Sequence, residues 1–309
     1  MTNYYSNGKL LITGEYVVLD GALSLALPTI FGQSLNVEPI AEKEIFWKSF
    51  NSDDSVWFED SFSLTDFNAN SKNELNEISK RVIEIFKAAK TLNPEFLNSD
   101  HGYKISTKLT FPKNWGLGSS STLLNNLAQW ANVNPFDLLK LTFGGSGYDI
   151  ACAQNSNPIT YQIDTLRDSQ KSINIKKVDF DPEFKEHLYF IYLNKKQNSR
   201  EGIATYNANK QNITSVVSEI SDITNQVINA TTLEDFENLI SHHEMIISKI
   251  TKQPTVKDMI FKDFKGSVKS LGAWGGDFVL VASKKDPTSY FKDKGFNTLV
   301  PYNKMILQF

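Results

Sequence analysis

Short apolar segments bounded by turn-forming residues recur in the N-terminal part of the chain, which is the pattern of β-strands. Four segments rich in β-branched and aromatic residues are separated by glycine and proline, at residues 9–19, 23–27, 34–38 and 44–50. These segments predict an antiparallel sheet. A further strand is predicted where apolar and polar residues alternate from Tyr103 to Leu109.

Apolar residues at helical spacing predict three helices in the first half of the chain. One follows the capping-box pattern of Ser71–Glu74 and is expected to pack on the sheet through Leu75, Ile78, Val82, Ile85, Phe86 and Ala89. A second follows a cluster of glycine and serine and has its apolar face at Leu123, Leu124, Leu127, Ala128 and Ala131. A third helix is predicted over residues 135–143.

The composition turns polar at residues 179–183, before a new strand predicted over residues 187–193. We therefore expect two domains, residues 1–180 and 181–309. In the second domain one long helix is predicted over residues 200–229, and the capping box Thr231–Glu234 opens another. An apolar strand is predicted over residues 278–282.

The composition narrows the class of protein. With 309 residues, of which 40% are hydrophobic and 22% charged, the chain is typical of a soluble globular protein. A net charge of -3 and a pI near 5.9 argue against a broad nucleic-acid surface. The single cysteine, Cys152, excludes an intramolecular disulfide and fits a reducing compartment.

No secretory pattern or membrane span is expected at the N-terminus, because Glu15 and Asp20 interrupt its apolar stretch. We therefore predict a cytoplasmic protein with neither membrane nor nucleic-acid partners. His242 and His243 precede Glu244 without forming a His-Glu-x-x-His motif, so they are expected to be surface or core residues of a helix.

The segment Pro112–Thr122 is a candidate phosphate-binding loop. Gly116 and Gly118 permit positive φ, and the serines that follow can cap a helix whose first N–H groups and dipole favour an anion. An ordinary helix cap has the same composition, so both interpretations stay open on this segment alone. The P-loop and Rossmann fingerprints are missing, since Gly8-Lys9 is followed by Leu10 and no Gly-x-Gly-x-x-Gly occurs.

Two further glycine clusters carry an acidic residue. Gly144–Ala151 is expected to place Asp149 on a sharp turn, where the carboxylate can act on a ligand or bond its own backbone. Leu271–Asp277 precedes the apolar strand at residues 278–282, and an ordinary β-turn is the alternative there.

Four segments, taken in order, resemble motifs of the GHMP kinase superfamily, in its mevalonate and phosphomevalonate kinase branch. They are Gly8–Leu19, Pro112–Ser120, Gly145–Asp149 and Leu271–Asp277. The resemblance implies an α+β fold of two domains with the active site between them. Its N-terminal domain would contain a left-handed βαβ crossover, and its C-terminal domain would be ferredoxin-like.

The resemblance also implies an activity. A member of this branch would be a kinase that uses ATP and Mg²⁺ to phosphorylate a small molecule, with phosphomevalonate or mevalonate, intermediates of isoprenoid biosynthesis, as the leading substrates. A sugar or amino-alcohol kinase is one alternative, and a catalytically silent regulator that binds a nucleotide or metabolite is another. Such a protein would be a monomer or a homodimer.

Site residues follow from the matched motifs. The loop residues Gly116, Leu117, Gly118, Ser119, Ser120 and Ser121 would bind the ATP phosphates, with the Ser120 hydroxyl beside Mg²⁺. Asp149 would orient the substrate hydroxyl and Lys9 would pair with Asp149. Substrate contacts would come from Gly147, Tyr148, Gly275, Gly276 and Asp277.

Two further contributions rest on charge. Glu15 is expected to support the site, because an unpaired carboxylate inside an apolar strand would be costly. Ser199 and Arg200 end a cationic segment, Lys195–Arg200, that could bind an acidic substrate, although a solvated strand end is equally possible.

The sequence departs from the family pattern at three places. Asn7 stands where a proline is usual, and Trp274 replaces a glycine of the segment Leu271–Asp277, which puts close backbone contact with a ligand in doubt. No glutamate matches the Mg²⁺-binding glutamate that precedes the catalytic aspartate in mevalonate kinase. Asp137 lies one position out of register and is better interpreted as a helix-start residue.

Overall fold

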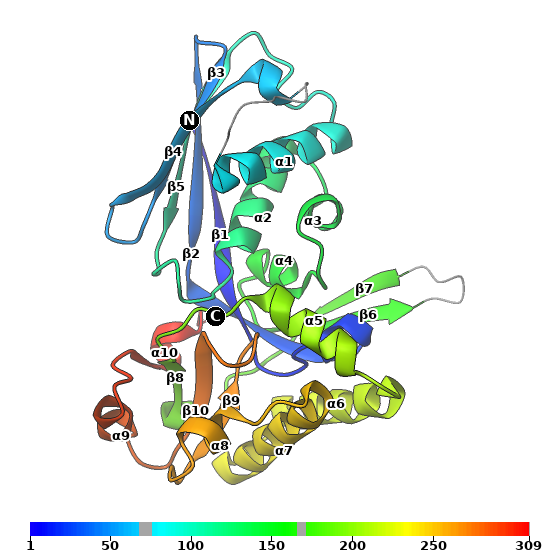
Figure 1. Ribbon diagram of the computed structural model, residues 1–309, viewed down its shortest axis with the longest axis vertical. Coiled ribbons are helices and arrows are strands. Elements are labelled where there is room, and N and C mark those ends of the chain that lie inside the picture. The colour runs from blue at the N-terminus through cyan, green and yellow to red at the C-terminus, as the bar shows by residue number, and fades with distance from the viewer. Residues whose placement is uncertain (68–75, 166–170, 309) are drawn as a thin grey trace. The chain divides into compact units, whose positions relative to one another are not determined.

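The computed structural model describes residues 1–67, 76–165 and 171–308, and contacts between Cα atoms divide the chain into two compact units (Figure 1). The first unit comprises Met1–Gly8, Phe31–Lys113 and Gly118–Gln154. The second comprises Lys9–Ile30, Asn114–Leu117 and Asn155–Phe309. Both units are discontinuous in sequence, and the domain boundary after residue 180 stays a prediction.

The sheet of the first unit has the strand order β4-β3-β5-β2. These strands are β2 (Ser24–Ile40), β3 (Glu44–Phe50), β4 (Val56–Ser63) and β5 (Gly102–Leu109). The predicted strand at 44–50 is confirmed, and so is the one that ends at Leu109. The segments at 23–27 and 34–38 instead belong to one strand, β2, because its backbone stays extended between them and pairs with β5 from Gln33 to Ile40.

The expectation of a wholly antiparallel sheet is wrong for β3 and β5, which pair in parallel. The chain between them passes through β4 and α1 (Glu77–Leu92), as a crossover connection requires. The left hand of this crossover stays a prediction. The 3-10 helix η2 (Leu64–Phe67) lies between β4 and α1 in sequence.

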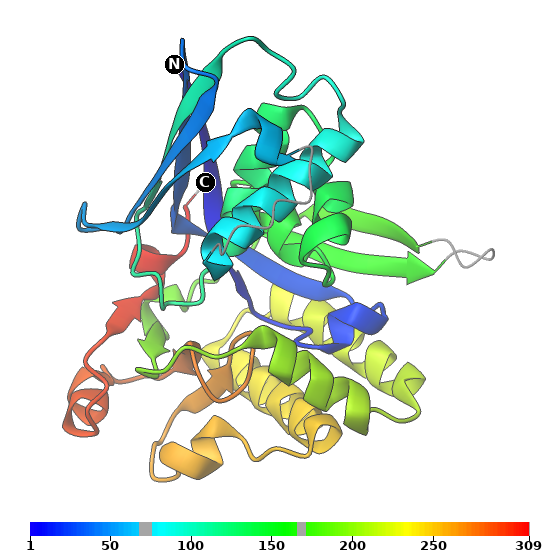
Figure 2. The ribbon, with the colours of Figure 1, turned by 45° about the horizontal axis from the view of Figure 1, so that its top comes forward.

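Four helices cover one face of this sheet: α1, α2 (Ser119–Ala131), α3 (Pro135–Thr142) and α4 (Tyr148–Ala153) (Figures 1 and 2). A core cluster joins the strands to these helices through Ile45, Trp47, Ile105, Phe86, Leu124 and Leu127. On the predicted face of α1, Ile78 is exposed while the later apolar positions are buried. The capping box at 71–74 and Leu75 lie outside the described residues, and the side chain of Asn76 caps α1.

The predicted strand over residues 9–19 is wrong beyond its beginning. Strand β1 (Thr2–Leu11), which pairs with β2, ends at Leu11, and the 3-10 helix η1 (Val17–Asp20) follows. The chain turns between them because Gly14 and Tyr16 both have positive φ, at 93° and 63°. An extended strand requires negative φ, so β1 cannot continue through these residues.

The second unit contains a four-stranded antiparallel sheet in the order β11-β8-β10-β9. Its strands are β8 (Leu188–Tyr192), β9 (Ser267–Ser270), β10 (Phe278–Ala282) and β11 (Leu299–Pro301). Helices connect β8 to β9 and β10 to β11, which is the βαββαβ connectivity of a ferredoxin-like domain. The predicted strand over residues 278–282 is confirmed as β10.

The helices of this unit are α5 (Ser199–Asn209), α6 (Ile213–Ile228), α7 (Leu233–Thr251), α8 (Val256–Ile260), α9 (Thr288–Asp293) and α10 (Tyr302–Met305), with the 3-10 helix η3 (Lys185–His187) before β8. The single helix predicted over residues 200–229 is wrong: α5 and α6 are separate because Asn212 has φ 47°. Helix α7 is capped by Thr232 rather than Thr231, since the Thr232 hydroxyl accepts the Asp235 N–H at 3.1 Å.

The strands β6 (Ile159–Thr165) and β7 (Lys171–Lys177) form an antiparallel pair in the second unit, and β6 also pairs with Ser24–Ala26 at the start of β2. None of the helices in the described part of the chain has the length and apolarity needed to cross a membrane.

Candidate active site

Lys9 is attached to the candidate phosphate loop at two points. Its backbone N–H donates to the Leu117 carbonyl at 3.0 Å, and its Nζ donates to the Gly116 carbonyl at 3.2 Å. The first contact fixes the backbone of β1 beside the loop and the second directs the side chain toward it. The structure thus brings two predicted site elements together within the second unit.

Asp277 approaches the same loop. Its carboxylate lies where a Cβ of Gly116 would stand, so only glycine fits there without moving Asp277. The Asp277 backbone takes a positive φ of 52° and donates its N–H to the Lys195 carbonyl at 2.7 Å. Its Oδ1 accepts the Gln197 N–H at 3.1 Å. Lys9, Gly116 and Asp277, which were predicted from three separate motifs, therefore form one cluster.

The charge of this cluster depends on burial. Burial raises the pKa of the Asp277 carboxyl, while the Gln197 N–H and the positive charges of Lys9 and Lys196 lower it. The carboxylate is thus only partly compensated by its cationic neighbours. A further cation bound beside Asp277 would be stabilised by this carboxylate.

The glycines of the third cluster differ in their surroundings. A Cβ on Gly276 would lie 2.7 Å from the Lys195 carbonyl oxygen, whereas Gly275, with φ 90°, has open space around the Cβ position. The Trp274 backbone N–H donates to the Tyr16 hydroxyl at 2.9 Å, and its side chain is buried. The N–H of Trp274 is therefore bonded to Tyr16 rather than directed at a ligand. This agrees with the expectation that a tryptophan in place of glycine makes close backbone contact with a ligand doubtful.

The rest of the phosphate loop lies in the first unit. Gly118 has φ 93° and is the N-cap of α2, and no side chain among the described residues caps this helix. Asn and Thr side chains cap α1, α3, α5, α7 and α8, whereas α6 also begins without a side-chain cap, at Asn212. The first turn of α2 also contains no acidic residue. The first N–H groups of α2 and the positive end of its dipole are therefore available to an anionic ligand bound at the loop.

The three serines of the loop have different environments. Ser120 is exposed and Ser119 is half-buried at the start of α2. Ser121 is buried, and its hydroxyl donates to the Gly118 carbonyl at 2.9 Å. Of these three serines, Ser120 is the one whose residue is exposed at the helix start.

Asp149 lies in the first turn of α4 rather than on an open turn, which corrects the sequence expectation. Gly147, with φ 90°, is the N-cap, and Tyr148 and Asp149 are the first two helical residues. The glycine redirects the chain into a helix, so the sharp bend precedes the aspartate. Oδ1 of Asp149 accepts the Ile150 N–H at 3.1 Å. Lys9 belongs to the second unit and Asp149 to the first, so their pairing stays a prediction.

Asp137, Ser199 and Arg200 are all exposed at helix starts. Asp137 lies in the first turn of α3, behind the Asn134 cap, as a helix-start aspartate does. Ser199 and Arg200 open α5, and the Arg200 N–H donates to the Asn198 side chain at 3.1 Å. The side chain of Arg200 is therefore accessible to a ligand, while its backbone is fixed by the cap.

Glu15 has a partner that the sequence did not reveal. It lies in the turn after β1, not within a strand, and its Oε1 is 2.5 Å from Nζ of Lys269, with both side chains completely buried. The expectation that Glu15 needs a partner is satisfied by Lys269. A signal existed in the sequence, because a lysine inside a short, otherwise uncharged strand also requires a counter-charge.

His242 and His243 are on helix α7, one at its surface and one in the core, as expected for surface or core residues of a helix. His243 is buried, and its Nε2 accepts the Gly14 N–H at 2.9 Å. His242 is about half exposed, with Nε2 3.1 Å from Glu219. Burial lowers the pKa of His243, so its ring is neutral.

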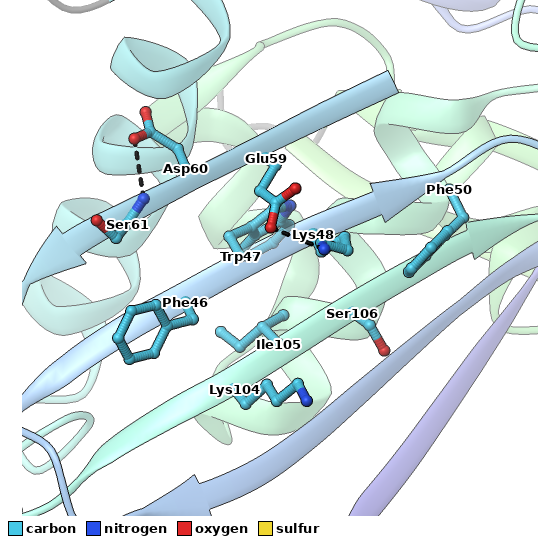
Figure 3. A pocket seen from close by; sticks show the side chains of 10 residues that line it. All are labelled: Phe46, Trp47, Lys48, Phe50, Glu59, Asp60, Ser61, Lys104, Ile105 and Ser106. Carbon is cyan, nitrogen blue, oxygen red and sulfur yellow. Dashed lines mark hydrogen bonds and ion pairs between the residues drawn. The ribbon is translucent and has the colours of Figure 1, made fainter. Parts of the chain in front are cut away.

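A separate hollow of about 940 Å³ lies on the sheet of the first unit, over β3, β4 and β5 (Figure 3). Phe46, Lys48, Phe50 and Lys104 line it, and Lys48 forms an exposed ion pair with Glu59 at 2.8 Å. None of the predicted site residues is among the residues that line it. Its lining combines the exposed Phe46 with the core residues Trp47 and Ile105, and the Lys48–Glu59 ion pair at its rim is open to solvent.

The fold is that of several solved small-molecule kinases. The structure of mevalonate kinase from Methanococcus jannaschii has a TM-score of 0.69 and 17% identity, over 95% of this chain and 94% of that one. Streptococcus pneumoniae phosphomevalonate kinase in complex with phosphomevalonate and AMPPNP has 0.69 and 15%, over 100% and 99%. Lactococcus lactis galactokinase complexed with galactose has 0.64 and 14%, over 94% and 88%. No family model and no curated protein matches the sequence.

Proposed function

We propose that this protein is an ATP- and Mg²⁺-dependent kinase of the GHMP superfamily that phosphorylates a small acidic alcohol or phosphate, with phosphomevalonate or mevalonate as the leading substrates. The observation that carries the proposal is the start of α2. A helix of 13 residues begins at Gly118 with φ 93°, without a side-chain cap or an acidic residue in its first turn, directly after a glycine loop to which Lys9 is hydrogen-bonded at Gly116 and Leu117. This arrangement suits a phosphate.

The phosphate loop supplies the nucleotide contacts in this proposal. Backbone N–H groups from Gly116 to Ser121 would donate to the phosphate oxygens, and positive φ at Gly116 and Gly118 lets the backbone turn toward them. Lys9, whose Nζ is attached to the Gly116 carbonyl, would add a positive charge beside the loop. Positioning and charge neutralisation of this kind supply most of the catalysis in phosphoryl transfer.

The residues present fit a magnesium ion that is bound mainly through phosphate. Mg²⁺ is usually held by one or two protein oxygens together with substrate phosphates, and the exposed hydroxyl of Ser120 stands at the start of α2. Among the described residues, no cluster of three His, Cys, Asp or Glu side chains could hold a metal ion. Bound Mg²⁺ would neutralise the charge of the phosphate oxygens.

Asp149 and Lys9 are the proposed catalytic residues. The carboxylate of Asp149, at the start of α4, would accept or orient the proton of the substrate hydroxyl. Lys9 would limit the build-up of negative charge near the attacking oxygen. Asp149 already accepts its neighbour's N–H, and a carboxylate has further lone pairs with which to bind a hydroxyl.

An acidic substrate is supported by the segment Lys195–Arg200. Its backbone bonds Asp277 through Lys195 and Gln197, so the cationic segment and the third glycine cluster are adjacent within the second unit. Arg200 and its neighbours Lys195 and Lys196 are exposed. Arginine suits bidentate binding of the carboxylate or phosphate that such substrates carry.

A sugar or amino-alcohol kinase is the alternative within the same fold, since a galactokinase shares it. A catalytically silent protein that binds a nucleotide or metabolite is the other. The joint presence of Lys9, Ser120 and Asp149 favours an enzyme over this second alternative.

The proposal is tested by incubating the purified protein with ATP, Mg²⁺ and a metabolite mixture, and searching for phosphorylated products by mass spectrometry. We expect phosphorylated mevalonate or phosphomevalonate. A coupled assay over a panel of alcohols then ranks the substrates, and preferred phosphorylation of a sugar or amino alcohol would contradict the acidic substrate. Binding of ATP without turnover of any alcohol would support the silent alternative.

A further inference from the structure

The turn after β1 has a strained backbone. Tyr16 has φ 63° and ψ -47°, and the Val17 N–H donates to the Glu15 carbonyl at 2.7 Å. A three-residue turn with positive φ at its centre is rare, and for a residue with a Cβ it is unfavourable. Such a conformation persists only where the surrounding structure over-determines it. The contacts of this turn should therefore show what it is for.

The first restraint is the buried ion pair between Glu15 and Lys269. Nζ of Lys269 lies 2.5 Å from Oε1 of Glu15 and donates to the Ser270 carbonyl at 3.0 Å. Lys269 is on β9, the strand that leads into the third glycine cluster. The two residues are 254 positions apart in sequence, and the pair ties the turn to that strand.

The residues around this pair hold the same two segments. The Gly14 N–H donates to Nε2 of His243, and the Ser270 N–H and hydroxyl donate to one carboxylate oxygen of Glu244 at 3.1 and 2.7 Å. His243 and Glu244 are neighbours on α7. One helix thus fixes both the start of the turn and the end of β9.

The turn at Tyr16 also contacts the third glycine cluster directly. The hydroxyl of Tyr16 accepts the Trp274 N–H at 2.9 Å. Burial raises the pKa of the Glu15 carboxyl, while Lys269 and the backbone of Gly272 oppose that rise. The Tyr16 ring stacks on Tyr206 of α5, with ring centroids 5.7 Å apart. The strained turn is therefore the point where the segments Gly8–Leu19 and Leu271–Asp277 and helix α5 meet within the second unit.

From these contacts we propose that Lys269 is a positioning residue: through Glu15 it holds the strained turn at Tyr16, and the turn fixes the third glycine cluster, Leu271–Asp277. The cluster ends at the Asp277 carboxylate beside Lys9 and Gly116. The catalytic consequence rests on the proposed kinase function, while the structural linkage does not.

The linkage is tested with two variants that remove different contacts. Glu15→Gln/Lys269→Met removes both charges together, which avoids leaving one buried charge unpaired. Tyr16→Phe keeps the ring stacked on Tyr206 but removes the acceptor of the Trp274 N–H. Lys185→Met is the matched control, since it breaks a partly exposed ion pair with Asp181 in the same unit.

Amide hydrogen exchange over residues 271–277 is the first measurement. We expect exchange to speed up by about tenfold or more in both variants and to stay unchanged in the control, with residues 188–192 and 278–282 little affected. Unchanged exchange at 271–277 would overturn the proposal. Equal acceleration in the strands would also overturn it, because Lys269 would then stabilise the unit as a whole. This measurement needs no substrate.

Steady-state kinetics are the second measurement. If the cluster positions Lys9 and Asp277, kcat should fall by about tenfold or more while the KM for ATP changes by less than about threefold. Wild-type kcat in variants whose exchange has accelerated would overturn the positioning role. Absence of kinase activity in the wild-type protein would refute the proposed function and leave the exchange result to decide the linkage.

Discussion

The carboxylate of Asp277 occupies the space that a Cβ on residue 116 would need, so the phosphate loop and the third glycine cluster, Leu271–Asp277, are complementary at Gly116. Gly116→Ala should displace this carboxylate from the Gln197 N–H and destabilise the protein by about 1–3 kcal/mol, the typical cost of overpacking. Urea unfolding measures the loss.

Gly144→Ala is the matched control for this substitution. Gly144 has a similar φ of 67°, compared with 70° at Gly116, but no neighbouring atom of the described residues lies within 4 Å of its Cβ position. Both variants bear the strain of positive φ, so the difference between them isolates the clash with Asp277. Equal losses would show that Asp277 moves aside without cost.

Asp149→Asn should lower turnover by about a hundredfold or more, because a positioned general base typically contributes about 10² to 10⁴ in rate. Binding of ATP should stay nearly intact, which calorimetry on the purified variant would check. Turnover like that of the wild-type protein in a folded variant would remove Asp149 from the catalytic role.

Gly118→Val should weaken ATP binding. Gly118 has φ 93° at the cap of α2, a conformation that a β-branched side chain disfavours, and the added methyl groups would crowd the phosphate loop. The affinity for ATP is measured by titration, after circular dichroism has established that the variant folds. Unchanged affinity would place the phosphate site elsewhere.

Arg200→Ala should raise the KM for an acidic substrate by roughly ten- to a hundredfold, which corresponds to the 1.5 to about 3 kcal/mol of a charge-assisted hydrogen bond. The KM for ATP should not change. Lys252→Ala, at the exposed end of α7, serves as a control for the loss of a surface cation. An unaltered substrate KM in Arg200→Ala would assign the cationic segment to the solvated surface.

The stability of the protein should fall as pH rises through neutrality because of Glu244. Burial raises the pKa of this carboxyl from 4.5 to about 7, although Lys269 and Ser270 lower it. The folded state therefore binds the proton more tightly than the unfolded state, and this contribution is fully present below about pH 4.5 and lost by about pH 7.

Glu244→Gln should remove that dependence while keeping an oxygen that accepts from Ser270. Relative to this variant, the wild-type protein should lose roughly 2–4 kcal/mol of unfolding free energy between pH 5 and 8. Urea unfolding at both pH values measures the difference, in which the titration of His243 cancels. Glu234→Gln, exposed on the same helix, is the control. Parallel pH profiles in the wild-type protein and Glu244→Gln would show that Glu244 stays ionised when folded.

Local patterns in the sequence were enough to predict the elements whose conformation depends on neighbouring residues. Alternation located β5, segments rich in apolar, β-branched and aromatic residues located β3 and β10, helical spacing located α2 and α3, and glycine marked the positive φ at residues 116 and 118. The order of the four glycine-containing motifs predicted the fold. Each of these features depends on side-chain periodicity or on the missing Cβ of glycine, and both can be read along the chain.

Contacts between distant residues decided the rest. The parallel pairing of β3 with β5 and the continuity of β2 depend on partner strands, and Tyr16 takes its strained φ only because residues near the C-terminus hold it. The sequence showed that Glu15 required a partner, but Lys269 lies 254 positions away. Burial determines which distant charges must meet, and burial is a property of the folded chain alone.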